Sequence, residues 1–351
     1  MNNSHKNILV APLNWGLGHA TRCIPIIKEL EKNGFNPIIA SDGNALELLK
    51  KEFPNVVALE LPSYHIEYSK NGRNLKWNLL KNSPKTCLAV LNEKKIVSKW
   101  VTKYSLSGII SDNRLGVYSK KIPSVYITHQ LNVLSGRTTW ISCKLHQHFI
   151  KKFTECWVPD SKYYVNLSGV MGHLKKTSLK LKYIGILSRF EKQNLPIKYD
   201  LMVLLSGPEP QRTLLEEKLI AELKDYKAQI IFIKGKIEDK QKIEVVQNIT
   251  FYNFMQTEEL EQTFNESEIT LCRSGYSTIM DLCKLERKSF FIPTPGQFEQ
   301  EYLAKKLKKS GHVPSSKQED FTINDLLKIA SYRGLPKMNS EIDWADLFRL
   351  F

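Results

Sequence analysis

The chain has 351 residues, of which 42% are hydrophobic and 25% charged, so a disordered or fibrous protein is excluded and two domains are expected. Lys and Arg outnumber Asp and Glu by 51 to 36, and residues 1–160 hold 22 of these basic side chains against 11 acidic ones. The first half is therefore expected to meet an anionic partner, namely nucleic acid, a lipid headgroup surface or a phosphorylated acceptor.

Short apolar runs rich in Ile, Val and Phe alternate with longer segments of helical period, which is typical of parallel strands covered by helices. The expected strands are residues 8–12, 37–41, 56–61, 108–112, 124–128 and 156–159 in the first half, and 201–206, 229–234, 249–252, 269–272 and 290–293 in the second. The simplest account is an α/β protein with two Rossmann-like parallel-sheet domains in tandem.

The join between the domains is expected between residues 160 and 198, where Ser, Gly, Lys and Pro interrupt the periodicity. A short apolar piece, residues 183–187, would carry the chain across. We place the domains at 1–165 and 166–335, and expect a helix within 336–351 that packs back on the first domain.

The longest apolar runs, such as residues 201–205, are far shorter than the ~18 residues that suggest a membrane span, so a transmembrane protein is excluded. The six cysteines never occur as C-x-x-C, and no secretory signal pattern begins the chain. Both features favour the cytoplasm.

The segment 65–104 carries nine Lys or Arg against two Glu, interleaved with Trp77, Trp100 and several Leu. One interpretation is a long helix with solvated lysines. The other is a basic amphipathic surface that meets anionic lipid or acceptor, which would make the protein peripheral on the inner face of the membrane.

The first strand runs into Gly16, Gly18 and His19 and then into a helical stretch. Glycines at such a turn let a ligand approach the backbone and the free N–H groups of the following helix. A dinucleotide site is a weak alternative, since its third glycine would stand at Thr21, although Asp42 suits a ribose. His19 would take up a proton as a base, or would serve only to shape the turn.

In the second half, Cys272-Arg273-Ser274-Gly275 follows a strand and opens a helix whose first amides suit a phosphate. Asp281, further along this helix, suits a ribose diol. The loop 293–302 after the next strand supplies amide and carboxylate side chains for sugar hydroxyls.

The pattern C-R-S-G-x-x-T-x-x-[DE], followed by P-x(6)-Q, resembles the donor half of GT-B glycosyltransferases of family 28 over residues 200–311. The best-known member of that family moves N-acetylglucosamine from UDP to a lipid-linked acceptor. The resemblance implies that the two domains face each other across a cleft, with the second binding the nucleotide sugar and the first the acceptor.

The resemblance also implies roles for matching residues. His19 is the base, and the donor is bound by Arg189, Gly207, Phe254, Met255, Ser274, Gly275, Tyr276, Ser277, Thr278, Asp281, Gln300 and Glu301. Within that set, residues 275–278 contact the diphosphate, Asp281 stands where a Glu holds the ribose, and Phe254 and Met255 lie beside the uracil. Glu301 replaces a second glutamine, and residues 206–209 replace a more glycine-rich loop, so the donor sugar and one phosphate contact are expected to differ.

Polar residues also end two other strands of the first domain. Asp112 is the second catalytic candidate, and the acceptor side is expected to include Gly16, Gly18, Asn113, Arg114 and His129. A structural role for these residues is an equal alternative.

We expect no metal site and no cofactor apart from the nucleotide sugar as co-substrate. A zinc site at Cys143, His146 and His148 is disfavoured, because His148 points away from the other two on a helix. No D-x-D motif occurs, whereas the other main transferase architecture holds its nucleotide through a carboxylate-bound metal.

The sequence thus predicts a metal-independent, inverting glycosyltransferase of the hexosyltransferase type. It would move a sugar from a nucleotide sugar, expected to be UDP-linked, to the hydroxyl of a carbohydrate or lipid-linked acceptor. A nucleotide-sugar hydrolase or an epimerase on the same fold is the alternative. A nucleic-acid-binding protein is disfavoured, because no recognised motif of that kind is present.

Overall fold

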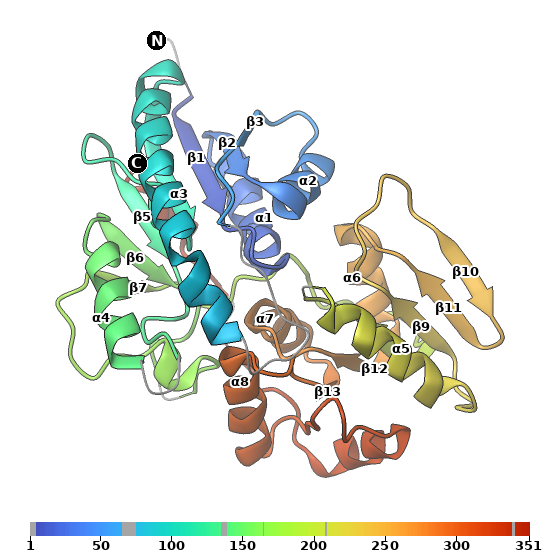
Figure 1. Cartoon of the computed structure of the whole chain (residues 1–351). Coiled ribbons are helices and arrows are strands. Elements are labelled where there is room, and N and C mark those ends of the chain that lie inside the picture. Colours follow the sequence, from blue (N-terminus) through green and yellow to red (C-terminus); the bar gives the residue numbers. More distant parts are fainter. Residues whose placement is uncertain (1–4, 65–74, 135–138, 164, 208, 339–340) are drawn as a thin grey trace. The chain divides into compact units, whose positions relative to one another are not determined.

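The computed structural model describes the whole chain except residues 1–4, 65–74, 135–138, 164, 208 and 339–340 (Figure 1). The chain folds into two compact units. The first comprises Met1–Ile66, Leu79–Leu187 and Asn339–Phe351, and the second comprises Glu67–Asn78 and Ser188–Met338. Each unit is built on its own sheet.

The sheet of the first unit is parallel, with the strand order β3-β2-β1-β4-β5-β6-β7. Its strands are β1 (Asn7–Pro12), β2 (Asn36–Ser41), β3 (Ala58–Glu60), β4 (Leu106–Asp112), β5 (Ser124–Ile127), β6 (Glu155–Val158) and β7 (Leu181–Tyr183). The central strands β1 and β4 are almost entirely buried. The apolar run of β1 and the buried Ile109 and Ile110 of β4 suit a sheet covered on both faces.

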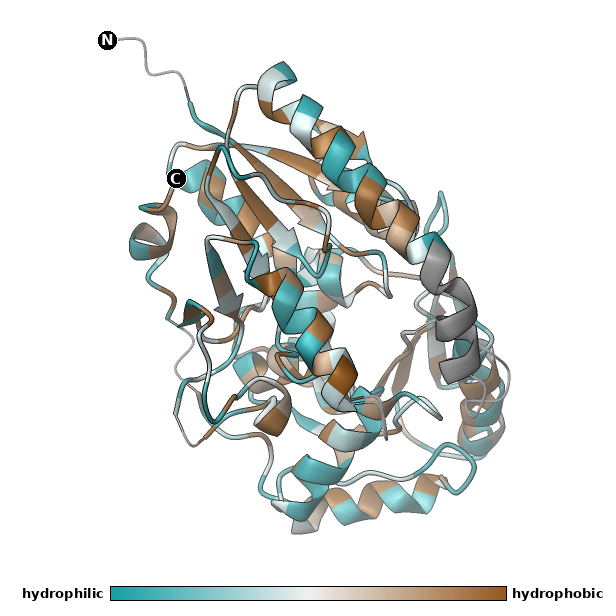
Figure 2. Cartoon of the chain, turned by 60° about the vertical axis from the view of Figure 1, so that its left-hand side comes forward, coloured by the Kyte–Doolittle hydropathy of each residue, from teal (hydrophilic) through white to brown (hydrophobic). Residues whose placement is uncertain are grey.

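The helices of the first unit are α1 (Gly18–Lys32), α2 (Gly43–Glu52), α3 (Leu75–Lys103, from Leu79 onward), α4 (Thr139–Ile150) and α9 (Trp344–Phe348), with a short 3-10 turn η3 (Gly169–Met171). In α3, Ala89, Glu93 and Val97 are buried at a spacing of four residues, so one stripe of the helix faces the sheet. Figure 2 shows the result as mostly brown strands beside helices that alternate brown and teal.

The sheet of the second unit has the order β10-β11-β9-β8-β12-β13 and is parallel except for β10. Its strands are β8 (Tyr199–Leu204), β9 (Ile230–Ile233), β10 (Ile243–Val246), β11 (Ile249–Tyr252), β12 (Ser267–Cys272) and β13 (Lys288–Phe291). The helices are α5 (Gln211–Leu223), α6 (Thr257–Asn265), α7 (Tyr276–Leu285) and α8 (Phe298–Lys309), followed by the 3-10 helix η4 (Ile323–Ser331).

Aromatic pairs fill the core of the second unit. Phe232 and Phe251 lie with ring centroids 5.2 Å apart, and Phe290 and Phe321 lie 5.5 Å apart. Both pairs belong to one cluster of buried side chains that joins the sheet to α5 and η4. This packing fixes where the strands end, and therefore where the loops that follow them lie.

The C-terminal segment packs on the first unit. The ring of Phe348 lies 5.7 Å from that of Phe35, and Phe351 lies 6.4 Å from Trp157. A Cβ atom at Gly108 would come within 2.2 Å of the Phe351 ring, so only glycine fits in β4 at this point.

The fold class predicted from the sequence is confirmed, and each expected strand overlaps an observed one. Two strands were missed: β10, which pairs antiparallel at an edge, and β7, part of which was assigned to the join between domains. Because β7 completes the first sheet, the first unit extends to Leu187 rather than to residue 165. The helix of the C-terminal segment is confined to α9, shorter than the span 336–351.

Candidate functional site

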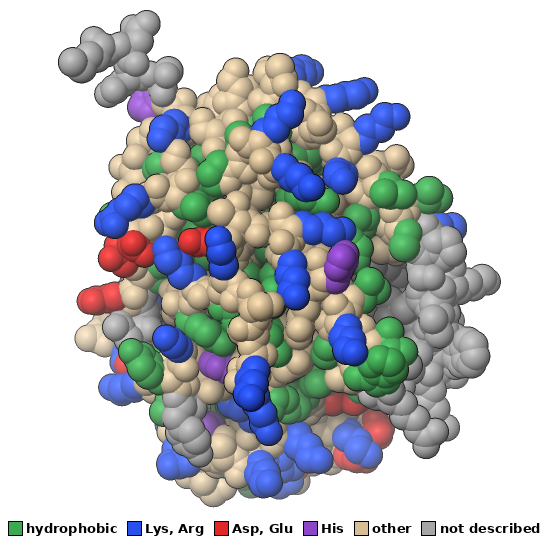
Figure 3. Space-filling view, turned by 90° about the vertical axis from the view of Figure 1, so that its left-hand side faces the viewer, with side chains coloured by type: hydrophobic (Ala, Val, Ile, Leu, Met, Phe, Trp, Pro, Cys, Tyr) green, Lys and Arg blue, Asp and Glu red, His purple; other side chains and the backbone are tan. Residues whose placement is uncertain are grey.

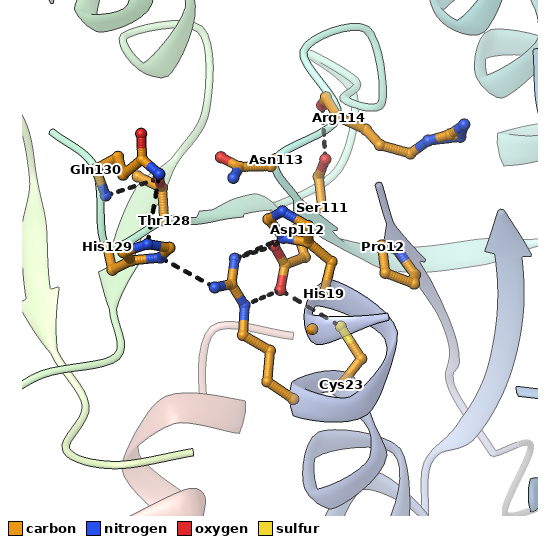
Figure 4. A network of polar contacts seen from close by, with 12 residues as sticks. Pro12, His19, Cys23, Ser111, Asp112, Asn113, Arg114, Thr128, His129 and Gln130 are labelled. Atoms are coloured by element: carbon orange, nitrogen blue, oxygen red, sulfur yellow. Dashed lines mark hydrogen bonds and ion pairs between the residues drawn. The ribbon is translucent and has the colours of Figure 1, made fainter. Parts of the chain in front are cut away.

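The first unit brings His19 and Asp112 together (Figure 4). Asp112 is the last residue of β4, and it lies opposite Pro12, the last residue of β1. His19 is in the first turn of α1, which follows β1. Its Nδ1 lies 2.7 Å from Asp112 Oδ1. The Asp112 side chain is fully buried, whereas 11% of the His19 side chain is exposed, so the histidine is the member of the pair that a substrate can reach.

The backbone before α1 bends sharply at Gly16, where φ is +71°. A residue with a Cβ would be strained in this left-handed conformation. No other atom lies within 4 Å of the position where that Cβ would stand. The turn therefore needs glycine for its backbone, and the same glycine leaves open space beside it. Asn113, just after Asp112, is also left-handed, with φ of +59°, and its side-chain oxygen accepts a hydrogen bond of 3.0 Å from the Tyr126 hydroxyl.

Arg22 lies one helical turn after His19, on the same side of α1, and is 2% exposed. Its Nε and Nη2 donate to the two oxygens of Asp112. Its Nη1 lies 3.0 Å from Nδ1 of His129, which follows β5. The four side chains thus form one buried polar cluster at the carboxyl end of the sheet, where open α/β folds bind their ligands.

The charges of this cluster shift the pKa values of both His19 and Asp112. Burial alone would raise the pKa of Asp112, but Arg22 and His19 outweigh it and lower that pKa to about 2. Burial and the nearby Arg22 guanidinium lower the pKa of His19, against an opposing effect of Asp112. A neutral imidazole beside an ionised carboxylate is the arrangement that a general base requires.

Arg114 does not point to an exposed acceptor surface. It is fully buried, its Nη2 donates a 2.6 Å bond to Asp42, and its Nε lies 3.1 Å from Glu93 of α3. Tyr64 completes this network by donating to Glu93 at 2.6 Å. Burial raises the pKa of Glu93 to about 7, although Arg114 opposes that shift. The Arg114 guanidinium therefore forms ion pairs within the protein, which hold α3 and the start of α2 to the sheet.

In the second unit, the turn after β12 leads directly into α7. Gly275 caps this helix and Tyr276 begins it. Tyr276 is 2% exposed and packs in the core, so only its backbone amide is suited to a ligand. Ser274 is also buried, and its hydroxyl donates a 2.8 Å bond to the backbone oxygen of Gln300. The amides at the start of α7, including those of Ser277 and Thr278, are the groups here that suit a diphosphate.

Arg273 fixes the position of this turn. It is 1% exposed and donates to the backbone oxygens of Ile292, Pro293 and Gln211, and to the side chain of Gln318. One buried side chain thus ties the turn after β12 to the turn after β13 and to the start of α5. Burial lowers the pKa of Arg273 to about 9.

Asp281 lies on α7 and accepts a 2.7 Å hydrogen bond from the Ser188 hydroxyl. Burial raises its pKa to about 7, although Arg189 and Ser188 oppose the shift. Arg189 itself donates a 2.9 Å bond to Thr257 at the start of α6. The hydrogen bond from Ser188 was not expected from the sequence, which contains no local signal for it.

The expected uracil and sugar residues are largely engaged within the unit. Phe254 and Met255 are 8% and 6% exposed and belong to the core. The Gln300 side-chain oxygen accepts from the Thr294 amide, and Glu301 accepts from the Gly296 amide, each at 2.8 Å. Both side chains therefore close the loop before α8. The Gln300 NH₂ group and the second Glu301 oxygen have no hydrogen-bond partner among the described residues, which leaves both for a ligand.

Two further polar groups of this loop were not predicted from the sequence. The Thr294 hydroxyl and the Gln297 side-chain oxygen are buried without a hydrogen-bond partner among the described residues. A buried polar group without a partner is costly and commonly marks a place where a ligand or water binds. Gly207 lies opposite, with φ of +102°, and a Cβ there would stand 3.9 Å from the Thr294 hydroxyl.

No cluster of three or more His, Cys, Asp or Glu side chains suited to a metal is found among the described residues. His146 is instead packed against Tyr126, with ring centroids 5.6 Å apart, and burial lowers its pKa to about 4. Within the residues that the structure describes, no helix has the length and apolar character needed to cross a membrane.

The chain is similar to several known proteins. Residues 210–347 match the model of the glycosyltransferase family 28 C-terminal domain. A UDP-N-acetylglucosamine--N-acetylmuramyl-(pentapeptide) pyrophosphoryl-undecaprenol N-acetylglucosamine transferase of Glaesserella parasuis is 24% identical over 92% of this chain and 88% of its own length. An uncharacterized glycosyltransferase of Methanosarcina acetivorans is 24% identical over 85% of this chain and 82% of its own.

Solved structures show the same fold. Acinetobacter baumannii MurG matches with a TM-score of 0.52 at 15% identity, over 93% of this chain and 92% of that one. The spinosyn forosaminyltransferase SpnP matches with a TM-score of 0.60 at 12% identity, over 93% and 90%. Residues 210–347 are thus similar to the glycosyltransferase family 28 C-terminal domain, and the chain is a glycosyltransferase of the GT-B fold.

Proposed function

We propose that this glycosyltransferase is metal-independent and inverting, and that it moves a sugar from a UDP-linked donor to the hydroxyl of a lipid-linked carbohydrate. The second unit binds the donor, and the first unit binds the acceptor and supplies the base. The assignments of donor, acceptor and base depend on individual side chains, whereas the fold does not.

The observation that carries the proposal is the 2.7 Å contact between His19 and Asp112. With Nδ1 directed to a carboxylate, the imidazole presents Nε2 as the atom that accepts a proton. In the proposed reaction, His19 Nε2 removes the proton of the acceptor hydroxyl while its oxygen bonds to the anomeric carbon. The bond from that carbon to the nucleoside diphosphate breaks at the same time, and one direct displacement inverts the configuration.

The departing diphosphate gains negative charge, which the start of α7 is suited to stabilise. Gly275 and the first residues of the helix present backbone amides there, and the helix dipole favours an anion at this end. Fixed donors of this kind typically contribute about 3 kcal/mol each to a transition state. The chain's own amides thus supply the stabilisation that a metal provides in other transferases.

The donor base is proposed to be uracil because the relative from Glaesserella parasuis uses a UDP sugar, as its name states. The same name supports an acceptor with a pyrophosphoryl-undecaprenol group. Glu301, where the family has a glutamine, supports a sugar that differs from N-acetylglucosamine.

A lipid-linked acceptor would require the first unit to meet a membrane surface. The exposed side of α3 carries Leu88 and Leu91, which are 61% and 63% exposed, together with Lys94, Lys95 and Lys99. On α4, Trp140 and Leu145 are 63% and 58% exposed and flank Lys144. Figure 3 shows Lys and Arg side chains spread over one face with few acidic ones. Such a surface is suited to anionic lipid from the cytoplasmic side.

The proposal is tested in two steps on the full chain. UDP, GDP and dTDP sugars are first screened for the rise in melting temperature that a bound ligand causes. Release of UDP is then followed with and without polyprenyl-pyrophosphate-linked sugars. Stabilisation by UDP sugars and acceptor-dependent release of UDP are expected. Release of UDP and free sugar from the donor alone would instead identify a hydrolase, and stabilisation only by GDP or dTDP sugars would contradict the choice of nucleotide.

A further inference from the structure

Arg22 has no role in the proposed reaction so far, yet it contacts every other member of the His19 cluster. Its Nε and Nη2 donate to both oxygens of Asp112, its Nη2 lies 2.8 Å from His19 Nδ1, and its Nη1 lies 3.0 Å from His129 Nδ1. The side chain is 2% exposed. A buried guanidinium shared between one carboxylate and two imidazoles constrains the protonation of all three.

The constraint on His129 follows from hydrogen-bond chemistry. A guanidinium only donates hydrogen bonds, so the contact of 3.0 Å requires Nδ1 of His129 to accept. In the neutral ring the proton must then be on Nε2. The same Nε2 lies 3.5 Å from the side-chain amide of Gln130, so this N–H group is directed to a neighbouring side chain, and His129 is not a base at that atom.

His19 is constrained in the opposite sense. An ionised carboxylate only accepts, so the contact of 2.7 Å with Asp112 requires a proton on His19 Nδ1. Its Nε2 then carries a lone pair. Nη2 of Arg22, at 2.8 Å from the same Nδ1, acts on this ring as a nearby positive charge, because a protonated Nδ1 cannot accept its hydrogen bond.

The two charges beside His19 oppose each other. A carboxylate alone at this distance would favour the imidazolium, which cannot accept a proton. Arg22, bound to both oxygens of Asp112, largely cancels that charge while it leaves the carboxylate in place to orient the ring. Asp112, Arg22 and His129 are the charged and titratable groups that face His19, and Cys23 contacts Asp112 at 3.7 Å without a charge of its own.

We propose that Arg22 is a positioning residue of the transfer site, which keeps His19 neutral as the base and fixes the neutral tautomer of His129. This inference rests on the proposed function for its purpose. The states of the two rings are properties of the protein alone and are measured without substrate.

The test is NMR of the full chain labelled with 15N and 13C in histidine. The chain has eight histidines, and the His19→Ala and His129→Ala variants assign the two signals. In the wild-type protein we expect the proton on Nδ1 in His19 and on Nε2 in His129, and a titration midpoint of His19 below ~6.5, the value for a free histidine.

Two variants then separate charge from shape. Arg22→Met keeps most of the length without the charge, and we expect the midpoint of His19 to rise by about 1 pH unit or more. Arg22→Lys keeps the charge, and the midpoint should stay within a few tenths of a unit of the wild-type value. A variant Asp112→Asn, which leaves the guanidinium without its carboxylate, should shift the midpoint downward.

Three results would overturn the inference. These are a His19 midpoint that is the same in Arg22→Met, a midpoint in Arg22→Lys that rises as far as in Arg22→Met, and a proton on Nδ1 of His129 in the wild-type protein. The last needs no substitution of Arg22, so it can be decided even if Arg22→Met fails to fold. Failure of the proposed function is recognised separately: if His19→Ala retains its turnover, His19 is not the base, whatever the titration shows.

Discussion

The hydroxyl of Ser188 and the carboxylate of Asp281 share a hydrogen bond of 2.7 Å, although 93 residues separate them. Asp281 is partly buried, and desolvation raises the pKa of its carboxyl to about 7. The pair joins the segment that enters the second unit to the helix proposed to hold the donor diphosphate.

The raised pKa of Asp281 predicts a pH dependence of stability. The folded protein binds the proton up to about pH 7, whereas an unfolded Asp loses it near its ordinary value of 3.8. The free energy of unfolding is therefore expected to fall as the pH rises from about 4 to about 7, by up to about 4 kcal/mol from this residue. Urea denaturation at several pH values measures it. Asp281→Asn should flatten that slope, and an unchanged slope would show that the carboxyl is ionised in the folded protein.

Loss of the base should affect turnover far more than binding. His19→Ala is expected to lower turnover by about 100-fold to 10,000-fold, the span typical of general base catalysis, with nearly unchanged affinity for the donor. Steady-state kinetics and calorimetry measure the two quantities. His5→Ala is the matched control, because His5 is an exposed histidine of the same unit. Similar losses in both variants would remove His19 from the mechanism.

The rate should depend on pH with a definite sign. The neutral form of His19 is active, and its pKa lies below the ordinary value of 6.5 because burial and Arg22 disfavour the charged ring. The wild-type kcat/KM is therefore expected to be constant at neutral pH and to fall only below pH 6.5. A profile that falls already between pH 8 and 7 would contradict a neutral His19, and the range ~5–8 is sufficient to decide.

Substitutions in the loop before α8 are expected to change binding of the sugar while they leave binding of the nucleotide nearly unchanged. Glu301→Gln restores the family's amide and keeps an oxygen for the Gly296 amide, so folding should be preserved. We expect this variant to change the preference among UDP sugars while the affinity for UDP stays within about 0.5 kcal/mol. Gln300→Ala should weaken UDP sugars more than UDP. Calorimetry with both ligands distinguishes the cases, and equal losses would assign the loop a purely structural role.

The basic side of α3 predicts binding to anionic vesicles. The double variant Leu88→Ser/Leu91→Ser should bind phosphatidylglycerol vesicles several-fold more weakly in a sedimentation assay, because it loses apolar area from that surface. Leu327→Ser is the matched control, since Leu327 is 79% exposed but lies in the second unit. Wild-type binding should weaken with added salt. Equal binding to phosphatidylcholine vesicles would contradict an electrostatic contribution.

The sequence predicted the parallel strands well, because a strand covered on both faces has an unbroken apolar run. β10 lacks that signal, because Glu244 interrupts its apolar residues. Ile243, Val245 and Val246 are exposed at the edge of the sheet. The join was placed too early because β7 has only three residues, all partly exposed. Short edge strands are defined by their neighbours more than by their own sequence.

The turns of the candidate site were predictable, but the partners of their side chains were not. Gly16, His19 and Asp112 follow from their places at the ends of strands. Arg22 is, in the sequence, one more polar residue on a helix, and only the fold shows that it meets a carboxylate 90 residues further on. The same limit applies to Arg114, whose charge lies close to both Asp42 and Glu93.

The packing of the C-terminal segment on the first unit has a consequence for recombining this enzyme with its relatives. The sheet and helices of the second unit all come from residues 188–338 and are thus inserted between β7 and α9. Exchanging the donor half for that of another transferase therefore needs two junctions, one near 187 and another near 338. A chimera with one junction would replace α9 as well, and would leave Phe35 and Trp157 without the aromatic rings that pack against them.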